Sequence, residues 1–333
     1  MPSKQFKITV LVDSATVPDG DRQFLKHSQK PTTEYYVIQT IRKLGHDVTI
    51  IPVEDSLKKL ANQLKKQNPD LVFNLTEEFK GDRRKDVVIT SLLENLKIPF
   101  TGSGTAGLTI CRDKILSKQI LNKHKINVPD FLLFPRGKTV KTPKTIKFPM
   151  VVKPAFEDGS EGISNASIVN NIQSLKKRVR FVTKKWKQAA IAEEFIKGRE
   201  FYVGIIGNKK PIALPIRECI FNTKSPRLAT YRVKWNEKYR KKWNVKFGFA
   251  KLDKEITGKI CETCKKAYKL LHLRDYGRID LRLTPQRKVV ILEVNANPDV
   301  AKGEDLAEAA KRAGILYGKF LSRIILEAIA RKS

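Results

Sequence analysis

A predicted β-hairpin near the C-terminal end constrains the fold most tightly, because it places carboxylates within a buried sheet. In residues 277–283 every second side chain is apolar, and Asp280 falls on the opposite face. After a short turn, residues 289–295 can return antiparallel, with Glu293 and Asn295 on one face. If the apolar faces of the two strands coincide, the Cβ atoms of Asp280 and Glu293 lie about 5 to 8 Å apart. The hairpin thus predicts two carboxylates and an amide side by side.

Two carboxylates at this distance repel each other unless a cation lies between them. Oxygen ligands without His or Cys favour Mg²⁺ or Mn²⁺ over zinc, and such ions commonly share substrate phosphates. The alternative is a set of ordinary ion pairs, of Asp280 with Arg278 or Arg282 and of Glu293 with a nearby lysine. Because Glu293 interrupts an apolar run, where an unneeded carboxylate is costly to bury, the metal site is favoured.

The order of strand and helix patterns predicts an α/β (α+β) protein of three domains. Residues 1–104 alternate strands and helices, which is typical of a parallel sheet covered by helices. Residues 105–192 predict a small α+β unit, and residues 193–333 predict a mostly antiparallel sheet with helices. The polar segment 13–31 predicts an irregular loop.

Several elements are predicted at residue level. The Gly-rich turn at 101–107 begins a helix that is expected to continue through Asp113 and Lys114. Cys261 and Cys264 form a lone CxxC motif, and two cysteines one turn apart on a helix are favoured over a metal or redox site. Further strands are predicted at residues 150–154, 166–169, 189–195 and 212–216.

The chain is strongly basic, with 66 Lys and Arg against 34 Asp and Glu and a net charge of +32. Such a charge attracts nucleotides, nucleic acid or an anionic surface. The basic residues are spread along the chain, which favours a solvated lysine-rich surface. Basic runs with aromatics at 184–187 and 234–243 nevertheless leave a nucleic-acid-binding protein as an alternative. Since no apolar run reaches 18 residues, we expect a cytoplasmic protein with no membrane partner.

A loop rich in small residues, 157–164, joins two predicted strands. Its backbone N–H groups could surround phosphates, and Lys153 at the end of the preceding strand adds a positive charge there. An ordinary Gly-Ser hairpin loop is the alternative.

The order of these segments resembles the ATP-grasp superfamily, most closely its D-alanine–D-alanine ligase-like branch. The resemblance implies an ATP-grasp fold preceded by a parallel-sheet domain, with ATP between the central and C-terminal domains. It spans residues 72–298 and rests on Val72–Glu77, Ile98–Ser103, Asp113-Lys114, Phe148–Pro154, Gly159–Ser164, Glu193–Glu200, Gly277–Asp280 and Leu292–Pro298.

The resemblance also implies roles for individual residues. Asp280, Glu293 and Asn295 match magnesium ligands, for two Mg²⁺ or Mn²⁺ ions. Arg278 matches the arginine that steadies the transferred phosphoryl group. The implied ATP-binding residues are Lys114, Lys153, Glu193, Glu194, Phe195, Ile196, Glu200 and Asn295.

The implied chemistry is a two-step ligation of amino-acid or peptide substrates. A carboxylate attacks the γ-phosphate to give an acyl phosphate, and an amine then displaces phosphate, while cations neutralise the developing charge. Ser160 belongs to the loop that closes over the phosphates, and Lys234 lies where a lysine reaches them. Glu77 is the preferred partner for a substrate amine, ahead of Glu34, which could equally be a helix N-terminal charge. The resemblance also leaves a homodimer as an alternative to a monomer, because the related ligases are commonly dimers.

The substrate side departs from the family pattern. The family's His-Gly pair is replaced by Thr76-Glu77-Glu78, its Lys-Tyr pair by Lys234-Trp235, and its paired serines by Gly159-Ser160. A Ser-Leu pair near the acceptor corresponds to Glu304-Asp305-Leu306, which would repel a substrate carboxylate. These departures predict an altered acceptor site, and they leave a degenerate ATP-binding protein as a further alternative.

Overall fold

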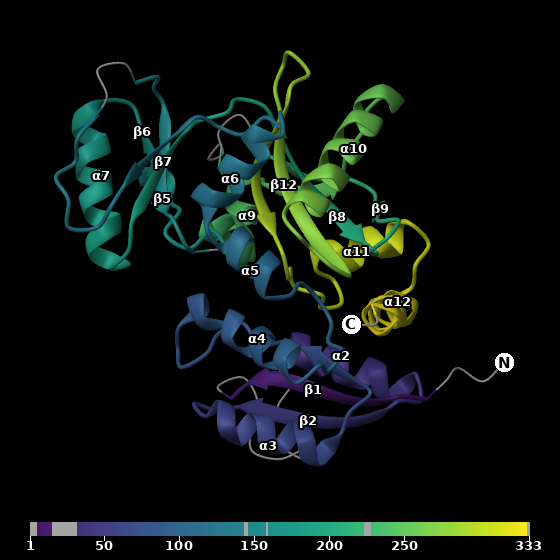
Figure 1. Ribbon diagram of the computed structural model, residues 1–333. Coiled ribbons are helices and arrows are strands. Elements are labelled where there is room, and N and C mark those ends of the chain that lie inside the picture. Colours follow the sequence, from purple (N-terminus) through teal and green to yellow (C-terminus); the bar gives the residue numbers. More distant parts are fainter. Residues whose placement is uncertain (1–4, 15–31, 143–145, 158, 223–227, 332–333) are drawn as a thin grey trace.

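The protein is described by a computed structural model that covers residues 5–14, 32–142, 146–157, 159–222 and 228–331. Most of the predicted loop at 13–31 lies outside these residues. Three sheets, each with its own helices, make up the molecule, and the predicted α/β class is confirmed (Figure 1).

The N-terminal sheet is parallel, as predicted, with strand order β2-β1-β3. It consists of β1 (Lys7–Asp13), β2 (Asp47–Val53) and β3 (Leu71–Asn74). Its helices are α2 (Thr33–Lys43), α3 (Leu57–Gln67) and α4 (Val87–Asn95). Side chains of α2 and of the last helix, α12 (Tyr317–Ala330), share one hydrophobic core with β1 and β3, while α3 and α4 contribute to another. The first and the last elements of the described chain, β1 and α12, therefore pack into one core.

The central sheet is antiparallel, with order β4-β7-β5-β6. Its strands are β4 (Phe131–Phe134), β5 (Met150–Pro154), β6 (Ile168–Val169) and β7 (Ala190–Glu194). α7 (Ile172–Lys185) packs on it through residues spaced three and four apart, after Asn171 caps its first turn. The strand predicted at 166–169 is wrong in its first half, because Asn165–Ser167 forms a 3₁₀ turn closed by a Ser164–Ser167 capping box.

The C-terminal sheet is antiparallel and carries the order β11-β10-β8-β12-β13, with β9 paired to β8. Its strands are β8 (Arg199–Ile206), β9 (Ile212–Ala213), β10 (Arg217–Ile220), β11 (Lys246–Phe249), β12 (Tyr276–Leu283) and β13 (Val289–Asn295). The helices are α8 (Tyr231–Trp235), α9 (Glu237–Trp243), α10 (Lys254–Leu270) and α11 (Asp305–Arg312). The predicted strand 212–216 ends already at Ala213, since Pro215 has no N–H to donate to a ladder.

The single helix predicted after the Gly-rich turn is in fact two, α5 (Thr105–Arg112) and α6 (Lys114–Lys123). Asp113 takes an extended conformation between them, and its Oδ1 accepts hydrogen bonds from the N–H of Ile115 (2.9 Å) and Leu116 (3.0 Å). This N-cap starts a new helix and sets the direction in which Lys114 points.

Both cysteines of the CxxC motif lie on α10, as predicted, and their thiols are free. Cys264 is packed in the hydrophobic core beneath β8 and β12. Across the parts of the chain that are described, no helix is both long and apolar enough to cross a membrane.

Candidate active site

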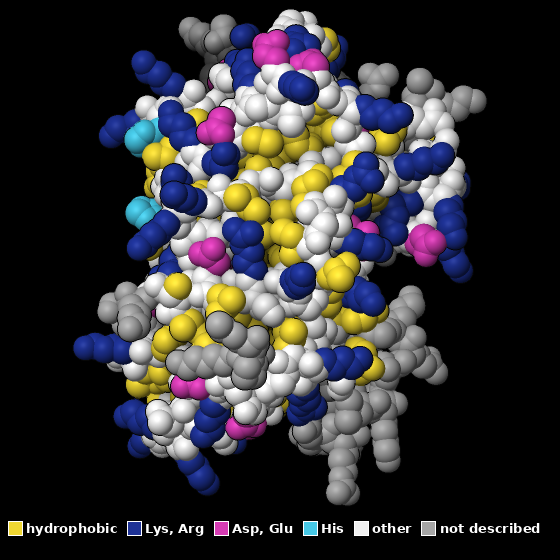
Figure 2. All heavy atoms as spheres, turned by 90° about the vertical axis from the view of Figure 1, so that its right-hand side faces the viewer, with side chains coloured by type: hydrophobic (Ala, Val, Ile, Leu, Met, Phe, Trp, Pro, Cys, Tyr) yellow, Lys and Arg dark blue, Asp and Glu magenta, His cyan; other side chains and the backbone are white. Residues whose placement is uncertain are grey.

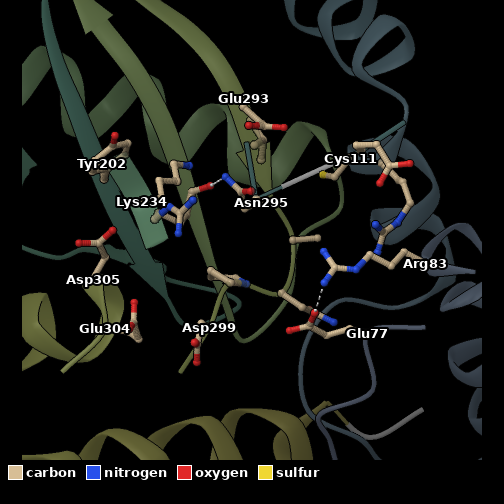
Figure 3. A pocket seen from close by; sticks show the side chains of 18 of the residues that line it. Glu77, Arg83, Cys111, Tyr202, Lys234, Glu293, Asn295, Asp299, Glu304 and Asp305 are labelled. Carbon is tan, nitrogen blue, oxygen red and sulfur yellow. Dashed lines mark hydrogen bonds and ion pairs between the residues drawn. The ribbon is translucent and has the colours of Figure 1, made fainter. Parts of the chain in front are cut away.

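The hairpin of β12 and β13 pairs Asp280 directly with Glu293, which confirms the predicted proximity. The ladder is not regular, because the partner of Leu281 is Ile291 and Leu292 becomes an extra residue in a β-bulge. No signal in the sequence predicted this bulge. Glu293 and Asn295 lie beside each other along β13, facing the cavity drawn in Figure 3.

Each carboxylate of the hairpin has a cationic partner. Asp280 Oδ1 lies 2.7 Å from Arg278 Nε, and Asp280 Oδ2 lies 3.5 Å from Lys234 Nζ. Glu293 Oε1 lies 2.5 Å from Lys114 Nζ. Although burial by itself raises the pKa of Glu293, the charges of Lys114 and Lys153 hold that pKa well below its ordinary value. Both the metal site and the ion-pair alternative require an ionised Glu293. The ion pairs that the alternative predicts are present, between Asp280 and Arg278 and between Glu293 and Lys114.

The donor set of the hairpin fits a hard divalent cation. Asp280 and Glu293 supply carboxylate oxygens, and the amide nitrogen of Asn295 faces the Arg278 carbonyl at 3.5 Å, which leaves the amide oxygen for another contact. No group of three or more His, Cys, Asp or Glu suited to a metal occurs within the described ranges. Oxygen atoms from two carboxylates and one amide are the ligands that Mg²⁺ prefers.

A buried cluster of two lysines and one glutamate lies next to the hairpin. Glu193 Oε2 is 2.9 Å from Lys153 Nζ, and Glu193 Oε1 is 3.3 Å from Lys118 Nζ. Burial lowers the pKa of Lys118 to about 8, whereas for Lys153 the effect of burial is outweighed by the charges of Glu193 and Glu293, which raise its pKa. Lys118 also donates to the carbonyl of Leu292 in the bulge. The cluster joins α6, β5, β7 and β13.

Lys118 is a residue that the sequence analysis missed. It follows Lys114 by four positions on α6, so both side chains project from the same face of the helix. The four-residue spacing was the signal that could have identified Lys118. Because one unbroken helix was predicted from the Gly-rich turn, nothing indicated that the face carrying Lys114 and Lys118 points toward the hairpin.

Glu200, predicted to hold a ribose, is already fixed by two neighbours. Its Oε2 lies 2.7 Å from Arg282 Nη2, and its Oε1 accepts a 2.8 Å hydrogen bond from the Tyr202 hydroxyl. Arg282 also donates to the Ile196 carbonyl at 2.6 Å. Arg282 therefore does not pair with Asp280, one of the two partners considered above. It orients instead two of the residues predicted to bind ATP.

Six of the residues predicted to bind ATP line one small cavity of about 60 Å³, called the smaller cavity below. Ser160, Lys234, Asp280 and Glu293 also contribute to its wall. The six are Lys153, Glu193, Glu194, Phe195, Ile196 and Glu200.

The loop at 157–164 lies over this cavity and is held by side chains from neighbouring elements; Asp158 is outside the described residues. Ser160 has φ +64° and donates a 2.9 Å hydrogen bond to the Ala229 carbonyl. Arg178 on α7 donates to the Gly162 carbonyl at 2.7 Å. Gly162 has φ +71°, and a Cβ there would lie 2.6 Å from Pro154 Cδ, so the loop requires glycine at this point.

A larger cavity of about 460 Å³ opens between the hairpin and the N-terminal domain. Lys114, Lys234, Arg278, Glu293 and Asn295 line it, and so does Glu77. Figure 3 shows Glu77 and its partner Arg83 on one side of this space; their side chains are 3.3 Å apart. Glu34 lies in the first turn of α2 and is not among the residues that line either cavity.

Acidic side chains form the other side of the larger cavity. Asp299, Glu304 and Asp305 lie close together there (Figure 3). Asp305 is paired with Arg217 at 3.0 Å, and Asp299 accepts a 2.8 Å hydrogen bond from Thr33. Although Glu304 keeps part of its surface exposed, its partial burial and the charges of Asp299 and Asp305 raise its pKa. Neither Glu304 nor Asp299 has an ion pair among the described residues, but Asp299 accepts hydrogen bonds from Thr33 and from the Ala301 N–H.

The basic surface residues do not gather into one patch on the face shown in Figure 2. Lys and Arg side chains are scattered over that face between apolar and uncharged groups, and they outnumber Asp and Glu. This distribution agrees with a solvated lysine-rich surface.

Comparisons with known proteins agree on one family. The family described as D-ala D-ala ligase C-terminus matches residues 120–326. A D-alanine–D-alanine ligase of Aquifex aeolicus is 34% identical over 289 residues, covering 87% of this chain and 92% of the relative. A D-alanine–D-alanine ligase of Carboxydothermus hydrogenoformans is 28% identical, covering 87% of this chain and 90% of the relative.

Solved structures share the fold. A D-alanine–D-alanine ligase from Bacillus anthracis complexed with ATP superposes with a TM-score of 0.75 at 22% identity, covering 98% of both chains. The VanG D-Ala:D-Ser ligase from Enterococcus faecalis superposes with a TM-score of 0.71 at 19% identity, covering 97% of this chain and 100% of that one. With the family match over most of the chain, these likenesses lead to one conclusion: the chain belongs to the D-alanine–D-alanine ligase family of the ATP-grasp superfamily.

Proposed function

We propose that this protein is an ATP- and Mg²⁺-dependent ligase that joins a carboxylate to an amine through an acyl phosphate. The observation that carries the proposal is the pairing of Asp280 with Glu293 where the smaller and larger cavities meet, with Lys114 and Lys234 beside them. Negative charge from a phosphate and from an attacking carboxylate can be neutralised at this place from both sides.

The smaller cavity is the proposed nucleotide side. Glu200, oriented by Arg282 and Tyr202, would accept hydrogen bonds from ribose hydroxyls. Lys153 and Lys114 would approach the phosphates, and the loop around Ser160 would exclude water from them. Because an ATP molecule is larger than a cavity of about 60 Å³, the proposal includes a movement of the loop away from Ala229 when ATP binds.

The metal and the cations have separate tasks in this proposal. Mg²⁺ held by Asp280, Glu293 and Asn295 would neutralise charge on the phosphate oxygens. Arg278 is aligned by its 2.7 Å contact with Asp280 and would steady the transferred phosphoryl group. Lys234, on α8, would contact the same group from the side of the larger cavity.

The acceptor side of the larger cavity differs from what a D-alanine carboxylate would need. Glu304 has no ion pair within the described part of the chain, and Asp299 lies beside it. A free carboxylate on the acceptor would be repelled there, whereas a positively charged group would be attracted. We therefore propose an acceptor without a free carboxylate at this end, and Glu77 as a partner for a substrate ammonium.

Release of phosphate from ATP tests the proposal. We expect Mg²⁺-dependent release that is stimulated by a pair of substrates from a panel of D- and L-amino acids, amino-acid amides and diamines. Asp280→Asn is expected to lower turnover by about 10³-fold or more, because it removes charge from the metal and from Arg278. Asp55→Asn is the matched control on the exposed surface and should leave turnover unchanged.

Other outcomes would point to the other candidate functions. ATP binding without stimulated release by any member of the panel would indicate a degenerate ATP-binding protein. Absence of ATP binding, together with tight binding of single-stranded nucleic acid that weakens steeply with salt, would favour the nucleic-acid-binding alternative.

A further inference from the structure

A third cavity, called the α5 cavity below, has a volume of about 380 Å³ and shares no lining residue with the two cavities of the candidate active site. It lies where α5 begins, close to the C-terminal ends of α10 and α12. Four of its lining side chains are basic or can become so: Lys269, His272, Arg274 and Arg331. The hydroxyl-bearing Tyr268 lines it as well.

Donor groups at this cavity are buried and unsatisfied. Arg331 Nε and Nη1, Arg274 Nε and the Tyr268 hydroxyl have no hydrogen-bond partner among the described residues. Tyr268 is only 1% exposed, and the Arg331 side chain is 16% exposed. Proteins pair nearly all buried polar groups, so several unpaired donors at one cavity indicate an acceptor that binds there.

The carboxylates already present do not satisfy these donors. Asp275 is fully buried and lies 3.1 Å from Arg331 Nη2, but it also accepts hydrogen bonds from Gly102 N–H (2.8 Å) and the Asn208 amide (2.9 Å). Glu94, 40% exposed, reaches Arg274 only through Nη2, at 3.4 Å, and accepts from Thr105 N–H at 3.3 Å. These contacts leave the other donors of Arg331 and Arg274, and the Tyr268 hydroxyl, without a partner among the described residues.

The start of α5 adds to the preference for an anion. Gly104 is its N-cap residue and provides no side-chain cap, and Ala106 and Gly107 of the first turn line the cavity. N–H groups in the first turn of a helix and the helix dipole both favour negative charge.

We propose that the α5 cavity binds a small oxyanion, a phosphate- or carboxylate-bearing molecule whose oxygens accept hydrogen bonds from Arg274, Arg331 and Tyr268. This site is separate from the phosphate-binding residues of the proposed ligase reaction. The proposal therefore holds or fails independently of that reaction.

His272 provides a local probe, because it lines the cavity and the chain contains only 4 His. The imidazole NMR signals of the full-length protein are followed during titration with inorganic phosphate at constant pH and ionic strength, and His272→Gln identifies the signal. We expect a saturable shift of the His272 signal with phosphate and none with chloride. Parallel titrations with pyrophosphate and citrate distinguish phosphate from carboxylate ligands.

Variants then tie the shift to the unpaired donors. Arg274→Gln is expected to weaken phosphate binding about 10-fold or more, and Tyr268→Phe about threefold, because charged hydrogen bonds contribute more than neutral ones. Lys66→Gln, an exposed position on α3, removes the same unit of charge and should leave the affinity unchanged. Should Arg274→Gln disturb folding, as seen by circular dichroism, Tyr268→Phe decides, since it removes a single oxygen. The proposal is overturned by a His272 signal that does not saturate, or by equal affinities in these variants and Lys66→Gln.

Discussion

The two cavities of the candidate active site are built differently. Around the smaller cavity, charged side chains are buried and paired: Glu193 with Lys118 and Lys153, and Glu200 with Arg282. Around the larger cavity, Glu77 is 67% exposed although it pairs with Arg83, and Glu304 is exposed without an ion pair in the described chain. Buried pairs lose much free energy when one partner is removed, whereas exposed charges contribute little to stability. The difference suggests that the proposed nucleotide side is rigid and the acceptor side adaptable.

Removing the negative charge between the two buried lysines is the strongest test of this difference between the cavities. Glu193→Gln removes the carboxylate that pairs with both Lys118 and Lys153, and we expect a loss of ~3 to 5 kcal/mol in the free energy of unfolding. Urea denaturation at pH 7 measures it. Glu194→Gln, the adjacent and more exposed position on β7, is the matched control and should change stability by under about 1 kcal/mol. Equal losses in both variants would show that the buried ion pairs of Glu193 contribute no more to stability than an exposed carboxylate does.

A second test uses pH. Burial lowers the pKa of Lys118 from 10.5 to about 8, so between these values the unfolded chain binds the proton and the folded chain does not. Lys118 therefore destabilises the fold below pH 8, and this penalty disappears as the pH rises to 10.5. The difference in unfolding free energy, wild type minus Lys118→Met, should rise across this window by up to about 3 kcal/mol. Lys123→Met, exposed on the same helix, should show no such rise; a flat difference for Lys118→Met would refute a lowered pKa.

The smallest expected effect concerns the exposed side of the comparison. Glu304→Ser removes one of the two carboxylates that have no ion pair there among the described residues, and we expect the rate with D-alanine as acceptor to rise ~10-fold relative to the rate with a cationic acceptor. Unfolding free energy should stay within about 0.5 kcal/mol of wild type. Glu308→Ser lies in the first turn of α11, the helix that begins directly after Glu304. Its side chain does not line the cavity, so it should leave the acceptor ratio unchanged. If Glu304→Ser leaves the ratio of the two acceptor rates unaltered, Glu304 does not select the acceptor.

The parts of the fold that depend on local pattern were predictable from the sequence. Strand-helix alternation predicted the parallel N-terminal sheet, and two-residue periodicity predicted that Asp280 lies near Glu293. Errors arose where one residue overrides a pattern: Asp113 ends one helix and caps the next, and Pro215 ends a strand. Asp113 and Pro215 could each have been interpreted as the end of an element, but the apolar pattern continues past both residues.

Other features depend on packing between distant segments. The ion pairs of Lys118 with Glu193 and of Arg282 with Glu200 join residues 75 or more positions apart, and the unpaired donors of the α5 cavity come from α10, the loop after it and the C-terminal end of α12. Periodicity within one element carries no information about such contacts. The roles of the candidate site residues stay predictions that the variants above address.

The β-bulge at Leu292 has a consequence for how the hairpin can vary in length. Val289 and Ile291 before it, and Val294 and Ala296 after it, all belong to one hydrophobic core, although a regular strand would send odd- and even-numbered residues to opposite faces. The extra residue shifts this alternation by one position, so that Glu293 and Asn295 point toward the cavity. We therefore expect that residues can be added to or removed from the turn at 284–288 without turning Glu293 and Asn295 away from the cavity. Deleting one residue between Ile291 and Glu293 would instead turn the carboxylate into the core.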